Sequence, residues 1–191
     1  MERLSRATAG RSGELWTIGH WTCPKPAFLH PLLHQDIELL VDVRAQPGSR
    51  RSPQFDADEM PQWLDEAGIG YLHSPELGGR RGRQDADPGT NAGWRNASFK
   101  NYADYTLTMA YRTGLERLQE LARERRTAIM CGEPMPWRCH RLLISDALTA
   151  RGHRVEHIMS ATKADLHTIT SFARLEGTLV SYPAGAQEKL F

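Results

Sequence analysis

The stretch ELLVDVR at residues 38–44 is a nearly continuous apolar run that ends in charge. Such a run is typical of a parallel strand that is buried on both faces of a sheet. Two more runs have the same character, LWTIGH at residues 15–20 and TAIMC at residues 127–131. These three segments predict the centre of a parallel sheet.

Segments with helical periodicity separate these strands. Residues 24–35 carry apolar side chains at helical spacing, and residues 98–125 form the longest helical stretch, which we expect to break near Gly114. A further helix is expected over residues 139–151, and shorter strands over residues 70–73 and 154–160. The alternation predicts a single α/β domain, in which a mostly parallel sheet of about five strands carries helices on both faces.

Composition limits the class of protein. The chain has 191 residues, of which 40% are hydrophobic and 25% charged, as expected for one globular domain. The net charge of +1 gives no global field that would attract nucleic acid. No apolar run reaches membrane-spanning length and no signal-peptide core is present. Three cysteines do not make a disulfide framework, so we expect a cytoplasmic protein without a membrane partner.

The chain divides into three parts. Residues 1–13 are polar and rich in glycine, serine and arginine, which predicts a flexible N-terminus. Residues 14–176 form the domain, and within it residues 75–97 form a long loop without periodicity, typical of a lid or binding loop. Residues 177–191 form a C-terminal tail.

Polar side chains stand at the carboxyl ends of the predicted strands. Ligands of open α/β sheets bind in the crevice at these ends, so their coincidence favours a site over strand ends that merely meet water. The residues concerned are His20, Asp42, Arg44, His73, Glu76, Cys131, Glu133, His157 and Ser160.

Arginines extend this pattern along the same edge. Their planar forks suit phosphate or carboxylate, which favours an anionic ligand such as a nucleotide or a nucleic-acid backbone over solvated loop charge. Trp94, Phe99 and Tyr102 have faces on which bases could stack, although core packing fits at least two of them better. The arginines are Arg44, Arg50, Arg51, Arg80, Arg81, Arg83, Arg138 and Arg141. The substrate- or anion-binding candidates are His20, Asp42, Arg44, Arg50, Glu76, Arg80, Arg81, Arg138 and Arg141.

The segment CGEPMPWRCHR at residues 131–141 is the densest in reactive groups. Its catalytic candidates are Cys131, Glu133, Cys139 and His140. In one interpretation a cysteine is a nucleophile or persulfide carrier, since the order of strand, cysteine, loop and helix resembles the cysteine loops of rhodaneses and cysteine phosphatases. A cysteine in the first turn of the helix would have a lowered pKa. Pro134 and Pro136 count against close similarity, because they remove two amides from an anion cradle.

Two other interpretations stay open. The same cysteines, with His140 and Glu133, could hold a metal ion, but no C-x-x-C pair exists. Moreover, Cys139 and His140, as neighbours in a helix, would point about 100° apart. The sequence therefore predicts no cofactor and leaves a metal ion as an alternative. In the third interpretation the cysteines are structural and the arginines form salt bridges.

Taken together, these segments resemble the domain-of-unknown-function family 488. The resemblance implies the family's fold and points to His20, Asp42, Arg44, Glu76, Arg80, Cys131, Glu133, Cys139, His140 and Arg141, without supplying an activity. Trp21 stands where the family often has serine, and Gly132 where alanine is common. The matching pieces are TIGH (17–20), LLVDVRAQPGSR (39–50), GIGYLHSPELGGRR (68–81), WRNASFKNYADY (94–105), CGEPMPWRCHRLLISDAL (131–148) and VEHIMS (155–160).

The last five residues, QEKLF at 187–191, resemble the peptide by which bacterial repair and replication proteins dock on the DNA sliding clamp. Leu190 and Phe191 would enter an apolar pocket, and Gln187 would make a directional hydrogen bond. The alternative is a tail that packs on its own domain. The leading hypothesis is therefore a DNA-associated enzyme or binding protein of repair or genome maintenance. The alternatives are a small-molecule enzyme of rhodanese or phosphatase type and a non-catalytic adaptor.

Overall fold

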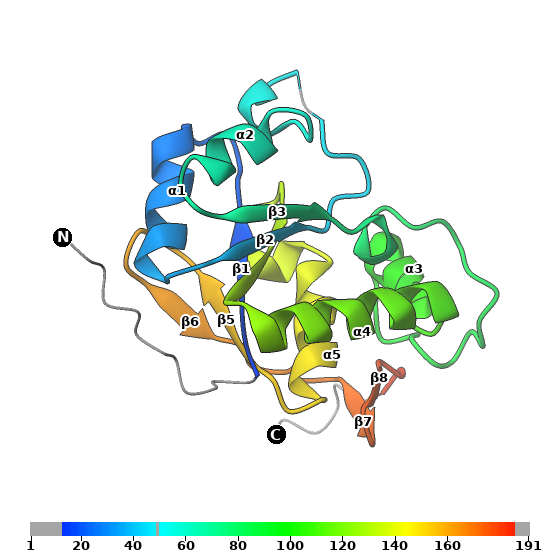
Figure 1. Cartoon of the computed structure of the whole chain (residues 1–191). Helices are drawn as coiled ribbons and strands as arrows, with labels where there is room; N and C mark the ends of the chain where they lie inside the picture. Colours follow the sequence, from blue (N-terminus) through cyan, green and yellow to red (C-terminus); the bar gives the residue numbers. More distant parts are fainter. Residues whose placement is uncertain (1–12, 49, 186–191) are drawn as a thin grey trace.

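A six-stranded sheet forms the centre of the part of the chain that the computed structural model describes, residues 13–48 and 50–185 (Figure 1). Strands β1 to β5 are parallel, and β6 pairs antiparallel with β5. The order across the sheet is β3-β2-β4-β1-β5-β6. The strands are β1 (Glu14–Gly19), β2 (Leu39–Asp42), β3 (Gly70–His73), β4 (Thr127–Cys131), β5 (Arg154–Ile158) and β6 (Ala164–Leu166). The predicted mostly parallel α/β sheet is confirmed.

Helices cover both faces of this sheet (Figure 1). Side chains alternate along each strand, so that Leu15 of β1 joins one buried cluster and Trp16 joins the other. The cluster around Trp16 packs on α1 (Lys25–His34) and α2 (Met60–Asp65). The cluster around Leu15 packs on α3 (Ala97–Tyr105), α4 (Met109–Glu124) and α5 (Arg141–Thr149). Three short 3-10 helices, η1 (Pro53–Phe55), η2 (Pro75–Leu77) and η3 (Pro136–Arg138), lie in the connections.

The long helical stretch divides before Gly114, at the point where Thr108 caps α4. Thr108 Oγ1 accepts a hydrogen bond from the amide of Tyr111 at 3.4 Å, which supplies an N-cap. The stretch is broken, as predicted, but the break lies at residues 106–108, and Gly114 lies inside α4. A Cβ on Gly114 would lie 2.9 Å from the Cβ of Glu76, so glycine here permits close packing of α4 on η2.

A small hairpin follows the sheet, formed by β7 (Arg174–Glu176) and β8 (Leu179–Ser181). Tyr182 directly after it is buried, and its hydroxyl donates a hydrogen bond to Asp146 Oδ2 at 2.8 Å. The packed chain therefore continues past residue 176, where the tail was expected to begin.

Several expectations fall outside the described residues. These are the flexibility of the N-terminal segment up to residue 12 and the docking peptide with Gln187, Leu190 and Phe191. Among the described helices, none has the length and apolar character required to cross a membrane.

The register of the parallel strands brings their carboxyl ends to one level. Gly19 of β1 pairs with Cys131 of β4, and Asp42 of β2 pairs with Met130. The residue that follows each strand therefore projects from the same edge of the sheet. β4 lies between β2 and β1, which places its end at the middle of this edge, where ligands of open α/β sheets bind.

Candidate functional site

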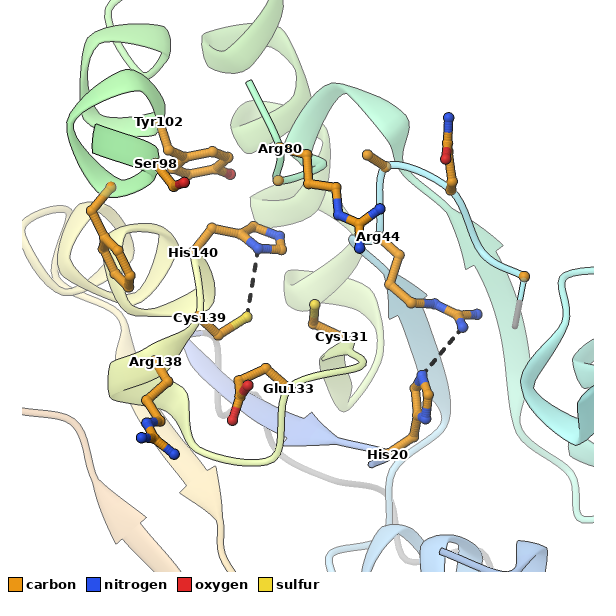
Figure 2. Close-up of a pocket in the computed structure, with 15 residues that line it drawn as sticks. His20, Arg44, Arg80, Ser98, Tyr102, Cys131, Glu133, Arg138, Cys139 and His140 are labelled. Carbon is orange, nitrogen blue, oxygen red and sulfur yellow. Dashed lines mark hydrogen bonds between the residues drawn. The ribbon is translucent and has the colours of Figure 1, made fainter. Parts of the chain in front are cut away.

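A cavity of about 480 Å³ opens at this edge of the sheet (Figure 2). Its walls come from the ends of β1, β2 and β4 and from the segments after β3 and before α5. Residues predicted from the sequence that line it are His20, Arg44, Arg80, Cys131, Glu133, Arg138, Cys139 and His140. It is also lined by Ala45, Gln46, Gly48, Gly79, Ser98, Phe99 and Tyr102.

His140 and Cys139 form a reactive pair in the cavity. His140 Nε2 lies 2.8 Å from the carbonyl oxygen of Val43, which can only accept a hydrogen bond, so Nε2 carries a proton. The other ring nitrogen, Nδ1, lies 3.5 Å from Cys139 Sγ. In the neutral ring Nδ1 is therefore an acceptor that faces the thiol, an arrangement typical of an activated nucleophile.

Cys139 and His140 precede the helix, contrary to the prediction. Helix α5 begins at Arg141, and Cys139 has an extended backbone with φ −132° and ψ 149°. The expected divergence of about 100° between their side chains applies only within a helix, so this argument against a metal site is wrong. Both side chains face Cys131, and the ligand atoms of the three residues all lie within 4.8 Å of one another. Figure 2 shows the two thiols side by side next to the imidazole.

The surroundings shift the pKa values of the two thiols in opposite directions. Burial alone would raise the pKa of Cys139, but the hydrogen bond from Cys131, the neighbouring His140 and Arg141 together hold it well below its usual value. The pKa of Cys131 is raised by its hydrogen bond to Cys139 and by burial. The pair thus favours a thiolate at Cys139, two residues before α5 rather than in its first turn.

Arg141 lies beneath the cavity instead of in it. This side chain is only 1% exposed, and its Nε donates a hydrogen bond to Cys139 Sγ at 3.4 Å. Its Nη2 donates to the carbonyl oxygens of Glu133 and Pro134. Arg141 therefore fixes the loop after β4 and the position of the Cys139 sulfur, and it does not line the cavity as a predicted anion-binding residue would.

Asp42 and Arg44 form a buried ion pair in the cavity wall. Arg44 Nη2 lies 2.6 Å from Asp42 Oδ2 and also donates to the carbonyl oxygen of Phe55. Arg44 Nη1 lies 3.3 Å from His20 Nε2. Burial and the neighbouring Arg44 lower the pKa of His20 to about 4, so His20 is neutral near pH 7. Asp42 thus neutralises Arg44 and does not contact the cavity itself.

Arg80 is the arginine that extends into the cavity. Its guanidinium points from the rim toward Arg44 (Figure 2), and it forms no salt bridge with any described residue. Its φ of 57° lies in the left-handed region, which is uncommon for a residue other than glycine and is often found at functional sites. Gly79 before it packs on the imidazole, since a Cβ there would lie 2.6 Å from His140 Nδ1.

The remaining charged candidates do not extend toward the thiols in the cavity. The guanidinium of Arg138 extends away from the thiols at the cavity rim (Figure 2), and Arg50 is exposed outside the cavity. Arg81 donates to the carbonyl oxygens of Pro75 and Gly78 and stacks on the ring of Tyr105 at 3.9 Å. Glu76 accepts a hydrogen bond from Ser74 Oγ at 3.2 Å.

Helix α3 supplies a wall in which the sequence indicated Phe99 and Tyr102 as possible stacking residues but gave no signal for Ser98. Tyr102 is buried with its ring centroid 5.0 Å from that of His140, and its hydroxyl donates to the carbonyl oxygen of Leu77 at 2.7 Å. Ser98 and Phe99 line the cavity beside it. Their sequence signal was the aromatic content of residues 94–105, which is equally typical of core packing.

His157, also predicted at a strand end, belongs to a separate buried network. Its Nδ1 lies 2.8 Å from Thr17 Oγ1, and its Nε2 lies 2.9 Å from His167 Nδ1. His167 Nε2 in turn lies 2.8 Å from Asp146 Oδ1. Burial, followed by the neighbouring His167, lowers the pKa of His157 to about 4. This network joins β1, β5 and α5 and does not line the cavity.

Comparison with known proteins gives a family and no activity. No match was found among the curated proteins or among the solved structures. The family model described as domain of unknown function DUF488 matches residues 26–148, which extend from α1 into α5 and include all the cavity residues described above except His20. The chain therefore belongs to the DUF488 family, as the resemblance of its motifs predicts.

Proposed function

We propose that this protein is a cysteine-dependent hydrolase or transferase that acts on a phosphate-bearing substrate, a nucleotide or a nucleic-acid strand. One observation carries the proposal: a single cavity contains the Cys131, Cys139 and His140 cluster and the guanidinium of Arg80. Reactive side chains next to an arginine guanidinium could react with a substrate while the guanidinium binds its anionic group.

The dimensions and lining of the cavity agree with a ligand of nucleotide size. A volume of about 480 Å³ falls within the range of small-molecule sites. Arg80 would bind the phosphate, since Arg44 is already neutralised by Asp42. The rings of Phe99 and Tyr102 on the α3 side provide apolar surface for a base or sugar.

Sulfur transfer of rhodanese type has less support. An anion cradle needs free amides in the loop after the cysteine, yet Pro134 and Pro136 have none. The amide of Met135 donates to Glu133 Oε1 at 3.4 Å, and that of Cys139 donates to the carbonyl oxygen of Pro136 at 3.1 Å. The loop after Cys131 thus uses these amides internally.

Replacing Arg80 with alanine is expected to weaken binding of a short single-stranded DNA by about tenfold or more, because a charge-assisted contact to phosphate is lost. Arg83 is an exposed arginine outside the cavity and gives a matched control, for which the affinity should stay within about twofold. Fluorescence anisotropy of a labelled oligonucleotide, with a nucleoside monophosphate as competitor, measures both. Equal loss in the two variants, or no binding by the intact chain, would exclude the cavity as the phosphate site and support the adaptor hypothesis.

We also propose that residues 187–191 attach the chain to the DNA sliding clamp, which would direct the enzyme to DNA repair or genome maintenance. The support is the sequence QEKLF itself, in which Leu190 and Phe191 are apolar and Gln187 is a directional donor and acceptor. Surface plasmon resonance should show that the intact chain binds purified clamp, and that a chain lacking residues 187–191 loses this binding. Undiminished binding by the shortened chain would contradict the proposed role of residues 187–191, and the proposal for the cavity would be unaffected.

A further inference from the structure

The Cys131, Cys139 and His140 cluster has the spacing of a metal-ligand set. Its two sulfurs and a ring nitrogen of His140 all lie within 4.8 Å of one another, and Cys139 Sγ lies 3.5 Å from His140 Nδ1. Around tetrahedral Zn²⁺, with bonds of about 2.3 Å to sulfur and about 2.1 Å to nitrogen, neighbouring sulfur and nitrogen ligands lie about 3.6 Å apart. The observed distance therefore fits a shared metal ion without movement of either side chain.

The partners of the imidazole and of the sulfur fit the same role. Metal-binding histidines donate their second N–H to a carbonyl or carboxylate, and His140 Nε2 has such a partner in the carbonyl oxygen of Val43 at 2.8 Å. The ring is held in place by Gly79 and Tyr102, which pack against it. Arg141 Nε donates to Cys139 Sγ, and a hydrogen bond of this kind stabilises a thiolate ligand.

We propose that Cys131 Sγ, Cys139 Sγ and His140 Nδ1 bind one Zn²⁺ ion whose fourth coordination position opens into the cavity. Two thiolates and an imidazole select zinc over magnesium or calcium, which prefer oxygen ligands. Three protein ligands with an open position are typical of a catalytic rather than a structural zinc site. The inference rests on the proposed function and deepens it: the two cysteines would act as zinc ligands in place of a nucleophile, and zinc would polarise a substrate oxygen or a water molecule beside Arg80.

Cys23 supplies a matched control for the zinc measurement. This third cysteine is half-buried, and its thiol donates a hydrogen bond to the carbonyl oxygen of His20 at 2.8 Å, outside the ligand set. We expect about one Zn²⁺ per intact chain by mass spectrometry of the purified, reduced protein. Competition with a chromophoric chelator should show that Cys131→Ser, Cys139→Ser and His140→Gln each weaken zinc binding by more than about 100-fold, since losing a second-shell partner alone costs up to that much. The Cys23→Ser variant should bind zinc as the intact chain does.

Cobalt substitution of the intact chain gives a readout that does not depend on the folding of any variant. Tetrahedral Co²⁺ bound by cysteine produces thiolate-to-metal charge-transfer bands in the near ultraviolet and d–d bands in the visible. The absence of these bands, or zinc retention by Cys139→Ser equal to that of Cys23→Ser, would overturn the metal site. A metal-free chain that still binds oligonucleotide through Arg80 would leave the proposed function intact and remove the zinc alone.

Discussion

Replacing Asp42 with alanine is expected to lower the free energy of unfolding by about 3–5 kcal/mol, because it leaves the Arg44 guanidinium buried without a counter-charge. Asp42 is completely buried and Arg44 is 7% exposed. The carboxylate also accepts hydrogen bonds from the amide of Arg44 at 3.0 Å and from the hydroxyl of Tyr71 at 2.8 Å. Urea denaturation followed by circular dichroism measures the loss.

Two further variants separate the ion pair from its surroundings. Tyr71→Phe removes one hydrogen bond and keeps the pair, so about 1 kcal/mol should be lost. Asp58 is an exposed aspartate between η1 and α2, and Asp58→Ala should change the unfolding free energy by about 0.5 kcal/mol or less. A loss for Asp42→Ala no larger than that for Asp58→Ala would contradict the buried pair.

Replacing Gly19 with alanine is expected to lower the unfolding free energy by about 3 kcal/mol or more, because the new methyl group would overlap backbone atoms. Its Cβ would lie 2.1 Å from the carbonyl oxygen of Glu133 and 2.6 Å from the Cα of Pro134. Gly19 has no positive φ, so the effect is steric and does not arise from backbone conformation. The same denaturation experiment measures it.

Gly82 provides the comparison for this substitution. A Cβ there would have no neighbour within 4 Å, so Gly82→Ala should stay within about 0.5 kcal/mol of the unchanged chain. If Gly19→Ala were equally neutral, the loop after β4 would not pack on the end of β1 as described. The position of Glu133 and Cys139 in the cavity would then lack its support.

The central strands could be predicted because burial on both faces leaves a continuous apolar signal. Residues 38–44 and 127–131 have this signal, and they form neighbouring parallel strands. Strand β6 has three residues with little burial, so no such signal marks it. The position of Gly114 misled the sequence interpretation, since a glycine required for close packing looks the same in sequence as one that ends a helix.

The site could be predicted to the extent that parallel strands end at one edge. This rule placed His20, Arg44 and Cys131 together. The rule does not give the direction of a side chain. It could not show that the Arg141 side chain is buried beneath the cavity, whereas that of Arg80 extends into it. The contribution of Tyr102 depends on how α3 packs across the sheet, which is long-range information that local sequence does not contain.

A phosphate analogue bound in crystals of the full chain would show whether the cavity is the anion site. Tungstate mimics phosphate and gives strong anomalous scattering. We expect an anomalous peak inside the cavity, between the guanidinium of Arg80 and the cluster of Cys131, Cys139 and His140. Tungstate bound only at exposed arginines such as Arg50 or Arg83, with none in the cavity, would contradict this expectation.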